Sequence, residues 1–481
     1  MTKNGSINLN MEVFVMLRTK LNRLLLSLLM SFVLASAALL TTASAAVTQP
    51  LWGDLNLDGE TDALDLVEFK LCLLMFKTPN PSAVFDLNGD GQIDALDYAA
   101  LKKALLIPAQ NDDIKVIKAN TDFAFDIFKV SNKNNSEKNV FISPLSISTA
   151  LSMVYQGAGS TTRDEMTKAL KYEGLDINTI NRGYKTILEY LNSIDPMVKL
   201  NISNSIWYKY NLNINNNFLE TNKNIFGSYI SPIDFTSPDA ANTINTWISN
   251  ATNHLIPSML QPPLDDMALC LINAIYFKGQ WTNIFDEKMS YNGSFYTGNN
   301  VRKNVVYMKK IHETMDYGEG TGYKAVRLPY GNGSMAMYCI LPDGNVNDLI
   351  ANLNAEKWNE IKKSIASARD VELLLPRFKM EYTESLNDAL KTLGMNKAFD
   401  STADFTGIAP GLFISEVKHK AVVEVNEKGT EAAAVTAVLM PTSVMPVEHP
   451  EFIADRPFVF VIADEKKGNI IFLGKAFDLQ E

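Results

Sequence analysis

Two acidic stretches near the N-terminus have the composition and spacing of calcium-binding loops. Residues 54–65 read D-L-N-L-D-G-E-T-D-A-L-D, and residues 86–97 read D-L-N-G-D-G-Q-I-D-A-L-D. Ca²⁺ prefers roughly six to eight oxygen ligands, and this spacing wraps side-chain oxygens and one backbone carbonyl around a single point, with glycine at the sharp turn. The predicted ligands of two Ca²⁺ ions are Asp54, Asn56, Asp58, Glu60, Asp62 and Asp65, and Asp86, Asn88, Asp90, Gln92, Asp94 and Asp97.

A helical pattern of apolar residues follows each loop, whereas the residues before the first loop read as irregular. An ordinary calcium-binding hand has a helix on both sides of its loop, so each copy here is a half-hand. Two loops that match in register are a much stronger signal than one, although an acidic surface repeat is the alternative. Because the ligand carboxylates repel one another, we expect this segment to fold only when Ca²⁺ is bound.

The sequence lacks the common catalytic motifs. It has four histidines but no H-E-x-x-H, and it has no G-x-S-x-G, P-loop or G-x-G-x-x-G segment. Acidic pairs are too common to indicate a glycosidase without knowledge of their geometry. We therefore predict that the protein is not an enzyme.

A stretch near the C-terminus is small, weakly apolar and compatible with a strand. Residues 427–436 read E-K-G-T-E-A-A-A-V-T. Gly429 allows backbone conformations that other residues avoid, so it can act as a hinge. Every second residue beyond it would share one face of a strand, and small side chains on that face can slip between existing strands. By composition alone, an Ala-rich helix running into a loop is the favoured alternative.

Length and composition indicate a globular protein with one large and one small domain. The chain has 481 residues, of which 46% are apolar, and its net charge is −10. An acidic chain lacks the basic face that nucleic acid binding needs. Residues 108–113 read as a linker, and residues 114–481 show helical patterns first and strand-like runs later, which predicts an α+β domain. Cys72, Cys270 and Cys339 have apolar neighbours and are expected to be buried thiols.

Residues 1–45 have the layout of a secretory signal peptide. Arg18, Lys20 and Arg23 precede an apolar run over residues 24–40, and small residues follow up to Ala45. A membrane anchor is the alternative, but the run is marginal in length and interrupted by serines. No other segment approaches about 18 consecutive apolar residues, so we expect a secreted protein without a membrane span.

The duplicated half-hand of residues 50–107 resembles a type I dockerin, the module that attaches secreted bacterial proteins to cohesin domains of a cellulosome scaffold. The resemblance implies calcium-dependent cohesin binding and an extracellular place in a cell-surface cellulosome. Many dockerins carry Ser-Thr at loop positions 10 and 11, whereas both copies here carry Ala-Leu, which leaves the choice of cohesin open. The positions that match the family's cohesin contacts are Ala63, Leu64, Lys70, Ala95, Leu96, Lys102 and Lys103.

Residues 114–481 resemble a serpin, a serine protease inhibitor, along their whole length. The matching motifs are residues 139–147 (NVFISPLSI), 271–281 (LINAIYFKGQW), 327–330 (RLPY), 427–436 and 455–458 (DRPF). The resemblance implies three β-sheets, eight or nine helices and a protruding reactive loop. It also implies a buried polar shutter beneath the main sheet and an aromatic residue at the breach, where loop insertion begins. These positions are Ser143, Ser146, Asn273, His419 and, at the breach, Trp281.

The same resemblance implies a suicide mechanism. A protease attacks the loop and forms its acyl-enzyme, and the cleaved loop enters the main sheet and drags the protease with it. Counting from the hinge gives Ser443–Val444 as the scissile bond, and counting back from residues 455–458 gives Val444–Met445. The hinge has the inhibitory form, without proline or charge on its inward face. Its matching residues are Glu427, Gly429, Thr430, Glu431, Ala432, Ala433, Ala434 and Thr436.

A small residue before the scissile bond suits subtilisin-like or elastase-like serine proteases and disfavours trypsin-like ones; a papain-like cysteine protease is also compatible. Two other functions are open at this point. A non-inhibitory serpin that acts as a binder or chaperone would be expected to have a bulky or charged hinge. A dockerin-borne carbohydrate-active enzyme would need a catalytic constellation that the sequence does not display. We expect a monomer before docking.

Overall fold

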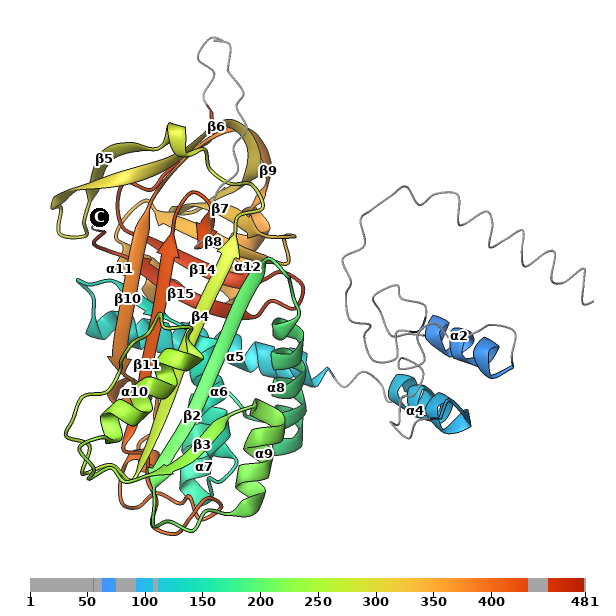
Figure 1. The fold of residues 1–481 in the computed structure, drawn as a ribbon. Coiled ribbons are helices and arrows are strands. Elements are labelled where there is room, and N and C mark those ends of the chain that lie inside the picture. Colours follow the sequence, from blue (N-terminus) through green and yellow to red (C-terminus); the bar gives the residue numbers. More distant parts are fainter. Residues whose placement is uncertain (1–54, 56–62, 75–91, 107–110, 431–448, 480–481) are drawn as a thin grey trace, which may run out of the picture. The chain divides into compact units, whose positions relative to one another are not determined.

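The computed structural model describes residues 55, 63–74, 92–106, 111–430 and 449–479 (Figure 1). The chain divides into two compact units, Met1–Ala109 and Gln110–Glu481.

The described part of the first unit contains two helices, α2 (Ala63–Leu73) and α4 (Ala95–Leu106). Each helix begins inside the last turn of a predicted calcium loop, as the half-hand pattern predicts. The two helices share a small apolar core, so this unit has its own hydrophobic centre. The core residues are Leu55, Phe69, Cys72 and Leu101, with Leu66, Ile93 and Tyr98 packed against them.

The second unit is built on two sheets. Among the described residues, one sheet has nine strands in the order β1-β15-β14-β8-β7-β6-β9-β13, with β5 also paired to β6. Strands β8, β14 and β15 are buried at every position, which explains their nearly continuous apolar sequences. The strands of this sheet are β1 (Val140–Ile142), β5 (Tyr291–Tyr296), β6 (Arg302–Gly320), β7 (Tyr323–Tyr330), β8 (Met335–Pro342), β9 (Ala366–Pro376), β13 (Glu451–Ile453), β14 (Phe458–Asp464) and β15 (Ile470–Ala476).

The other sheet has the order β10-β11-β4-β2-β3 in the described chain, and a sixth, short strand, β12, pairs with β4. Its central pair is parallel, because β11 and β4 run in the same direction, whereas β10–β11 and β4–β2 are antiparallel. The strands are β2 (Val198–Lys209), β3 (Tyr229–Ile233), β4 (Leu269–Gln280), β10 (Phe378–Ser385), β11 (Glu416–Val425) and β12 (Gly429–Thr430).

Helices cover both sheets of this unit. Helix α6 contacts β15 of the nine-stranded sheet and β4 of the other sheet, so it lies between them. On the opposite face of the second sheet, Ile244 and Ile248 of α10 pack against Cys270 and Ile272 of β4 (Figure 1). The α-helices are α5 (Asp112–Asn134), α6 (Pro144–Tyr155), α7 (Ser160–Ala169), α8 (Ile177–Asn192), α9 (Asn216–Phe226), α10 (Ala240–Ala251), α11 (Val346–Asn352), α12 (Ala355–Ser364) and α13 (Asn387–Thr392), and the 3-10 helices are η1 (Glu287–Met289) and η2 (Lys397–Phe399).

The ends of several helices follow directly from the sequence. Helix α6 begins at Pro144 behind Ser143, whose hydroxyl accepts a hydrogen bond from the backbone N–H of Ser146. Helix α5 begins at Asp112, two residues inside the expected linker. The Asp112 carboxylate is buried, and it bonds Arg182 at 2.8 Å and Lys115 at 3.2 Å. These bonds hold the helix start against α8.

The described strands form two hydrogen-bonded sheets rather than the three that the resemblance implies. The reason is the 19-residue strand β6, which pairs with β5 at its start, with β9 along its middle and with β7 at its end. One long strand therefore joins two groups of strands into a single ladder. The nine α-helices of the described second unit match the expected number.

Candidate functional site at the hinge of the second sheet

A four-residue turn connects β11 to β12. The turn closes with paired backbone hydrogen bonds between Asn426 and Gly429, at 2.9 and 3.2 Å. Gly429 has φ +139°, and a Cβ atom there would lie 2.1 Å from the carbonyl oxygen of Gly279. Only glycine fits this position, so the predicted hinge glycine is placed where both backbone conformation and space require it.

Strand β12 occupies the edge of β4 that β11 leaves free. The ladder between β11 and β4 covers residues 416–421 and 270–275. Further along, Thr430 pairs antiparallel with Gly279, while the opposite edge of Gly279 is taken by Val198 of β2. The chain after the turn therefore already runs antiparallel to β4 at one end of the space between β4 and β11.

The side chain of Thr430 points into the protein and is 1% exposed. Its hydroxyl lies 3.0 Å from the phenol oxygen of Tyr330. The Tyr330 ring stacks on Trp281 with 4.4 Å between ring centroids. Trp281 in turn donates its indole N–H to the carbonyl of Asn426 and its backbone N–H to that of Lys428, both at 2.9 Å. The predicted breach residue Trp281 thus contacts the turn directly and Thr430 through the ring of Tyr330.

Glu427 anchors the turn by an ion pair in which its own side chain is buried and that of Arg377 is partly exposed. The carboxylate is 3% exposed and receives two hydrogen bonds from Arg377 Nε at 2.7 and 2.8 Å and another from Arg377 Nη2 at 2.5 Å. Ser290 donates a further hydrogen bond to it. Burial by itself raises the pKa of Glu427, but the bonds from Arg377 and Ser290 outweigh it and hold the pKa below its usual value. The charged form fixes the hinge at its base.

A buried polar network crosses the central pair of strands. His419 of β11 and Asn273 of β4 are register partners, and both are fully buried with Ser143 and Ser146. His419 Nε2 accepts from the backbone N–H of Ser143 at 3.2 Å, so Nδ1 carries the proton and donates to Asn273 Oδ1 at 2.6 Å. Asn273 donates to Ser146 and, at 2.5 Å, to Asn204. The four predicted shutter residues therefore form one connected cluster.

This cluster ties the two central strands to the start of α6. Ser143 also donates its hydroxyl to the carbonyl of Ile471 in β15, at 2.7 Å, so both sheets are linked to it. Burial lowers the pKa of His419 to about 3, which keeps the imidazole neutral. A strand that enters between β4 and β11 must break the bond between His419 and Asn273. The cluster therefore bridges β4 and β11 at this point of the sheet.

In the first unit, the described residues fit a pair of calcium loops. Asp65 and Asp97 occupy the twelfth loop positions and are both fully buried. Asp65 accepts the backbone N–H of Leu55 at 2.7 Å, and Asp97 accepts that of Asp94 at 3.0 Å. Each carboxylate thus turns back onto its own loop, as a ligand at this position must. Oxygen-only donors of this kind suit Ca²⁺.

The expected cohesin-binding face is partly described. Lys70, Ala95, Leu96 and Lys102 are exposed, and the Leu96 side chain is 62% exposed. Ala63, Leu64 and Lys103 belong to α2 and α4, but their side chains lie outside the description. The exposed leucine and lysine side chains of these helices offer both apolar and charged contacts to a partner.

Several predicted site residues lie outside the described residues. They comprise the reactive bond, the later hinge positions and most of the calcium ligands. These residues are Glu431, Ala432, Ala433, Ala434, Thr436, Ser443 and Val444, and Asp54, Asn56, Asp58, Glu60, Asp62, Asp86, Asn88 and Asp90.

The structure also adds residues that the sequence did not single out. Arg377 and Ser290 donate hydrogen bonds to Glu427, and the hydroxyl groups of Tyr330 and Thr430 form a hydrogen bond. Asn204 accepts a hydrogen bond from Asn273 of the shutter network. Each is an ordinary polar residue in a strand or loop, and no local signal marks its partner.

The three cysteines are free and buried, as predicted. Burial raises the pKa of the Cys270 and Cys339 thiols, so both are unreactive. In the described part of the chain, no helix combines the length and apolar character needed to cross a membrane.

Comparisons with known proteins agree with this geometry. The family model for serpins, described as serine protease inhibitors, matches residues 118–479, and the model for the type I dockerin domain matches residues 52–106. Leukocyte elastase inhibitor of Bos taurus is 34% identical over 372 residues, which cover 74% of this chain and 97% of that protein.

Solved structures show the same fold. The native state of the thermophilic serpin tengpin superposes with a TM-score of 0.70 at 32% identity, covering 76% of this chain and 94% of that one. Human thyroxine-binding globulin in complex with thyroxine superposes with a TM-score of 0.70 at 27% identity, covering 77% and 100%.

Proposed function

The chain belongs to the serpin family and carries a type I dockerin domain at its N-terminus, and from this we propose that it is a secreted suicide inhibitor of serine proteases that docks onto a cellulosome scaffold. Members of this family are protease inhibitors and not catalytic enzymes, in keeping with the absence of catalytic motifs from the sequence. The proposal concerns the mechanism, the target and the docking.

The observation that carries the proposal is the position of Gly429 and Thr430. They already form an antiparallel pair with β4 on the edge next to β11, and the buried Thr430 hydroxyl forms a hydrogen bond with Tyr330. The following residues, from Glu431 to Thr436, are small or weakly polar on the face that would point inward. From this starting point, the proposed path of the inserted chain runs between β4 and β11.

Insertion would be favourable because of the strand directions. β4 and β11 form a parallel pair, and a strand between them that continues β12 would be antiparallel to both. The inserted strand would replace the slanted hydrogen bonds of one parallel strand pair with those of two antiparallel pairs, and it would bury its small side chains. Cleavage of the loop releases the chain for this movement, since the residues after Thr430 are then held at one end only.

The inhibitory step is a race between insertion and deacylation. The target protease attacks the carbonyl carbon of Ser443, forms an ester with its own serine and releases the amino group of Val444. Insertion of about 15 residues would carry that ester roughly 50 Å. Displacement of the catalytic groups by even about 1 Å is costly for hydrolysis, so the ester is trapped.

The proposed targets are subtilisin-like or elastase-like serine proteases, with a papain-like cysteine protease as a further class. The support is the small Ser443 side chain before the proposed bond, together with the similarity to leukocyte elastase inhibitor. A protease that requires Arg or Lys before the cut would find neither at Ser443 nor at Val444.

Docking would depend on two Ca²⁺ ions held by the twelve loop residues from Asp54 to Asp97. The described ligands Asp65, Gln92, Asp94 and Asp97 supply oxygen atoms only, which is the donor set that Ca²⁺ requires. Bound calcium would neutralise carboxylates that otherwise repel one another. The exposed face with Lys70, Leu96 and Lys102 would then meet a cohesin, and the inhibitor would protect a cell-surface cellulosome from proteolysis.

A non-inhibitory binding function is the second candidate, because thyroxine-binding globulin shares the fold and binds a small ligand. The hinge argues against it. Thr430 is small, and it is already buried and hydrogen-bonded to Tyr330, which favours insertion over a blocked hinge.

The decisive experiment is incubation of the mature protein with a subtilisin-type protease, followed by a denaturing gel and mass spectrometry of the released C-terminal peptide. We expect a covalent complex and a peptide that begins at Val444. A peptide that begins at Met445 would move the bond by one residue. Cleavage without a covalent complex, by this protease and by elastase-like and papain-like ones, would favour the non-inhibitory function.

A further inference from the structure

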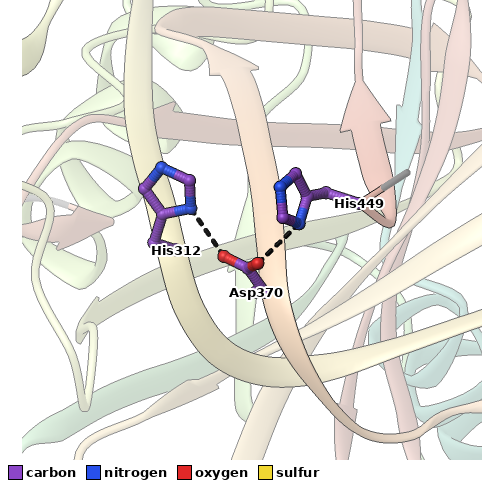
Figure 2. A group of neighbouring side chains, drawn as sticks. All are labelled: His312, Asp370 and His449. Atoms are coloured by element: carbon purple, nitrogen blue, oxygen red, sulfur yellow. Dashed lines mark hydrogen bonds and ion pairs between the residues drawn. The ribbon is translucent and has the colours of Figure 1, made fainter. Parts of the chain in front are cut away.

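Three side chains with metal-binding atoms converge at one place outside the hinge. His312 belongs to β6, Asp370 belongs to β9, and His449 stands two residues before β13. The Nδ1 atoms of His312 and His449 lie 2.5 Å from Oδ1 and Oδ2 of Asp370, respectively (Figure 2). The three ligand atoms all lie within 4.8 Å of one another.

The backbone is shaped to bring the first two residues together. The register of β6 and β9 shifts between Lys310 and Glu313 and again between Glu313 and Met315, so each strand carries an extra residue. His312 and Asp370 lie at these two irregularities, with φ of 55° and 62°. Left-handed conformations cost energy in residues other than glycine, and two of them face each other here.

Hydrogen bonding alone is a weak reason for this arrangement. The side chains of His312, Asp370 and His449 are 58%, 42% and 29% exposed, and exposed ion pairs contribute little to stability. A metal ion bound to all three would gain much more, because the three ligand atoms already lie within 4.8 Å of one another.

Two ion pairs on the same strands involve neither His312 nor Asp370. Lys309 pairs with Glu372 at 2.8 Å, and Lys310 pairs with Glu313 at 3.0 Å. The exposure of the cluster also gives an ion and one or more water molecules direct access.

We propose that His312, Asp370 and His449 bind one Zn²⁺ ion through two imidazole nitrogens and one carboxylate oxygen. Two nitrogens disfavour Ca²⁺ and Mg²⁺, and three protein ligands with an open fourth position are a common zinc arrangement. With bonds of about 2.1 Å, tetrahedral ligand atoms stand roughly 3.4 Å apart. The three ligand atoms here lie within 4.8 Å of one another, so side-chain shifts of roughly 1 to 1.4 Å would bring them to that spacing.

Zinc here would tie down the chain just after the segment that carries the proposed scissile bond. Pro450, the residue after His449, accepts a hydrogen bond from the backbone N–H of Glu372 at 2.9 Å, and β13 pairs with β9 from Glu451 onward. The ion would extend this attachment to β6. The binding site itself does not depend on the inhibitory mechanism.

The test is calorimetric titration of the full-length protein with ZnCl₂, in excess CaCl₂ so that the calcium loops are occupied. We expect one zinc equivalent to bind the wild type. His312→Asn should weaken this binding at least about tenfold through loss of one ligand, while keeping a residue that tolerates φ 55°. His254→Asn is the matched control, since His254 is also exposed with positive φ, 65°, and lies outside the cluster.

A second measurement does not rely on a substitution. Zinc should slow amide hydrogen exchange in Glu451–Ile453 of the wild type and leave it unchanged in His449→Gln. The proposal is overturned if the wild type shows no saturable zinc binding in excess calcium. It is equally overturned if His312→Asn binds zinc as tightly as His254→Asn. Either result could occur while the protein still traps proteases, so it would not bear on the proposed inhibitory function.

Discussion

At the residue scale, the fully buried His419 makes stability depend on pH. Its pKa is about 3 in the fold and near 6.5 when exposed. Between these values the unfolded chain binds a proton that the folded chain does not, so acid favours unfolding. The contribution of neutral His419 is complete above pH 6.5 and is lost progressively as the pH falls toward 3.

We predict that the free energy of unfolding of the wild type falls between pH 6.5 and pH 4 with a slope from this residue approaching about 1.4 kcal/mol per pH unit. His419→Gln should be less stable at pH 7 but should lose less on acidification. Urea titrations at several pH values measure both. His254→Gln is the control, because this exposed histidine is outside the network; identical slopes for the wild type and His419→Gln would refute the assignment.

Thr430 provides the second test at this scale. The side chain is 1% exposed and packed beneath Tyr330, so an arginine there would need either to bury an unpaired charge or to expel the hinge from β4. Thr430→Arg should be cleaved by a subtilisin-type protease without forming a covalent complex.

Thr430→Ser is the matched control, because it retains the hydroxyl and should retain the complex. Denaturing gels of both variants at equal protease ratios compare them. A persistent complex in Thr430→Arg would contradict the insertion mechanism.

The shutter positions could be named from the sequence only because their motifs resemble a known family. What the sequence could not supply is their partners. Asn204 joins Asn273 across 69 positions, and Arg377 meets Glu427 across 50. Such pairs are created by strand register, which local composition does not encode. The cluster of His312, Asp370 and His449 could not be predicted for the same reason, and the left-handed backbones of His312 and Asp370 have no sequence signature.

At the element scale, apolar patterning predicts most of the strands and helices from the sequence. The strand-like sequence runs at residues 335–341, 458–463 and 470–472 all lie inside observed strands. Strand β6 is different: it continues for 19 residues and joins groups of strands that were expected to be separate. Polar and charged residues in β6 obscure any alternation of apolar and polar positions. Neither its length nor its irregular pairing with β9 could therefore be predicted from the sequence.

The calcium unit yields a prediction about elements. Helices α2 and α4 share a core of a few apolar residues, and Asp65 and Asp97 bring fully buried carboxylates beside it. Such a small core cannot offset the repulsion of many acidic ligands without bound cations. In the full-length protein, removal of calcium should abolish slow amide exchange in α2 and α4 while α5 and α6 keep theirs. Retained protection of α2 and α4 in excess chelator would show that the unit folds without metal.

At the scale of the whole molecule, the two units have separate cores, one around Phe69 and Leu101 and one spanning both sheets of the second unit. Docking and inhibition should therefore be independent. Effects of substitutions that share no partners usually add.

The prediction is a double dissociation. Asp65→Asn combined with Asp97→Asn should lose binding to an immobilised type I cohesin, yet should form the covalent protease complex at a rate within about twofold of the wild type. Thr430→Arg should keep its binding to the cohesin and should lose the covalent protease complex. Substitution is preferable to chelation here, because a chelator would also remove zinc from His312 and His449. If the calcium-site variant inhibited much more slowly than the wild type, the dockerin would be coupled to loop insertion, and the inhibitor would be regulated by its own attachment to the scaffold.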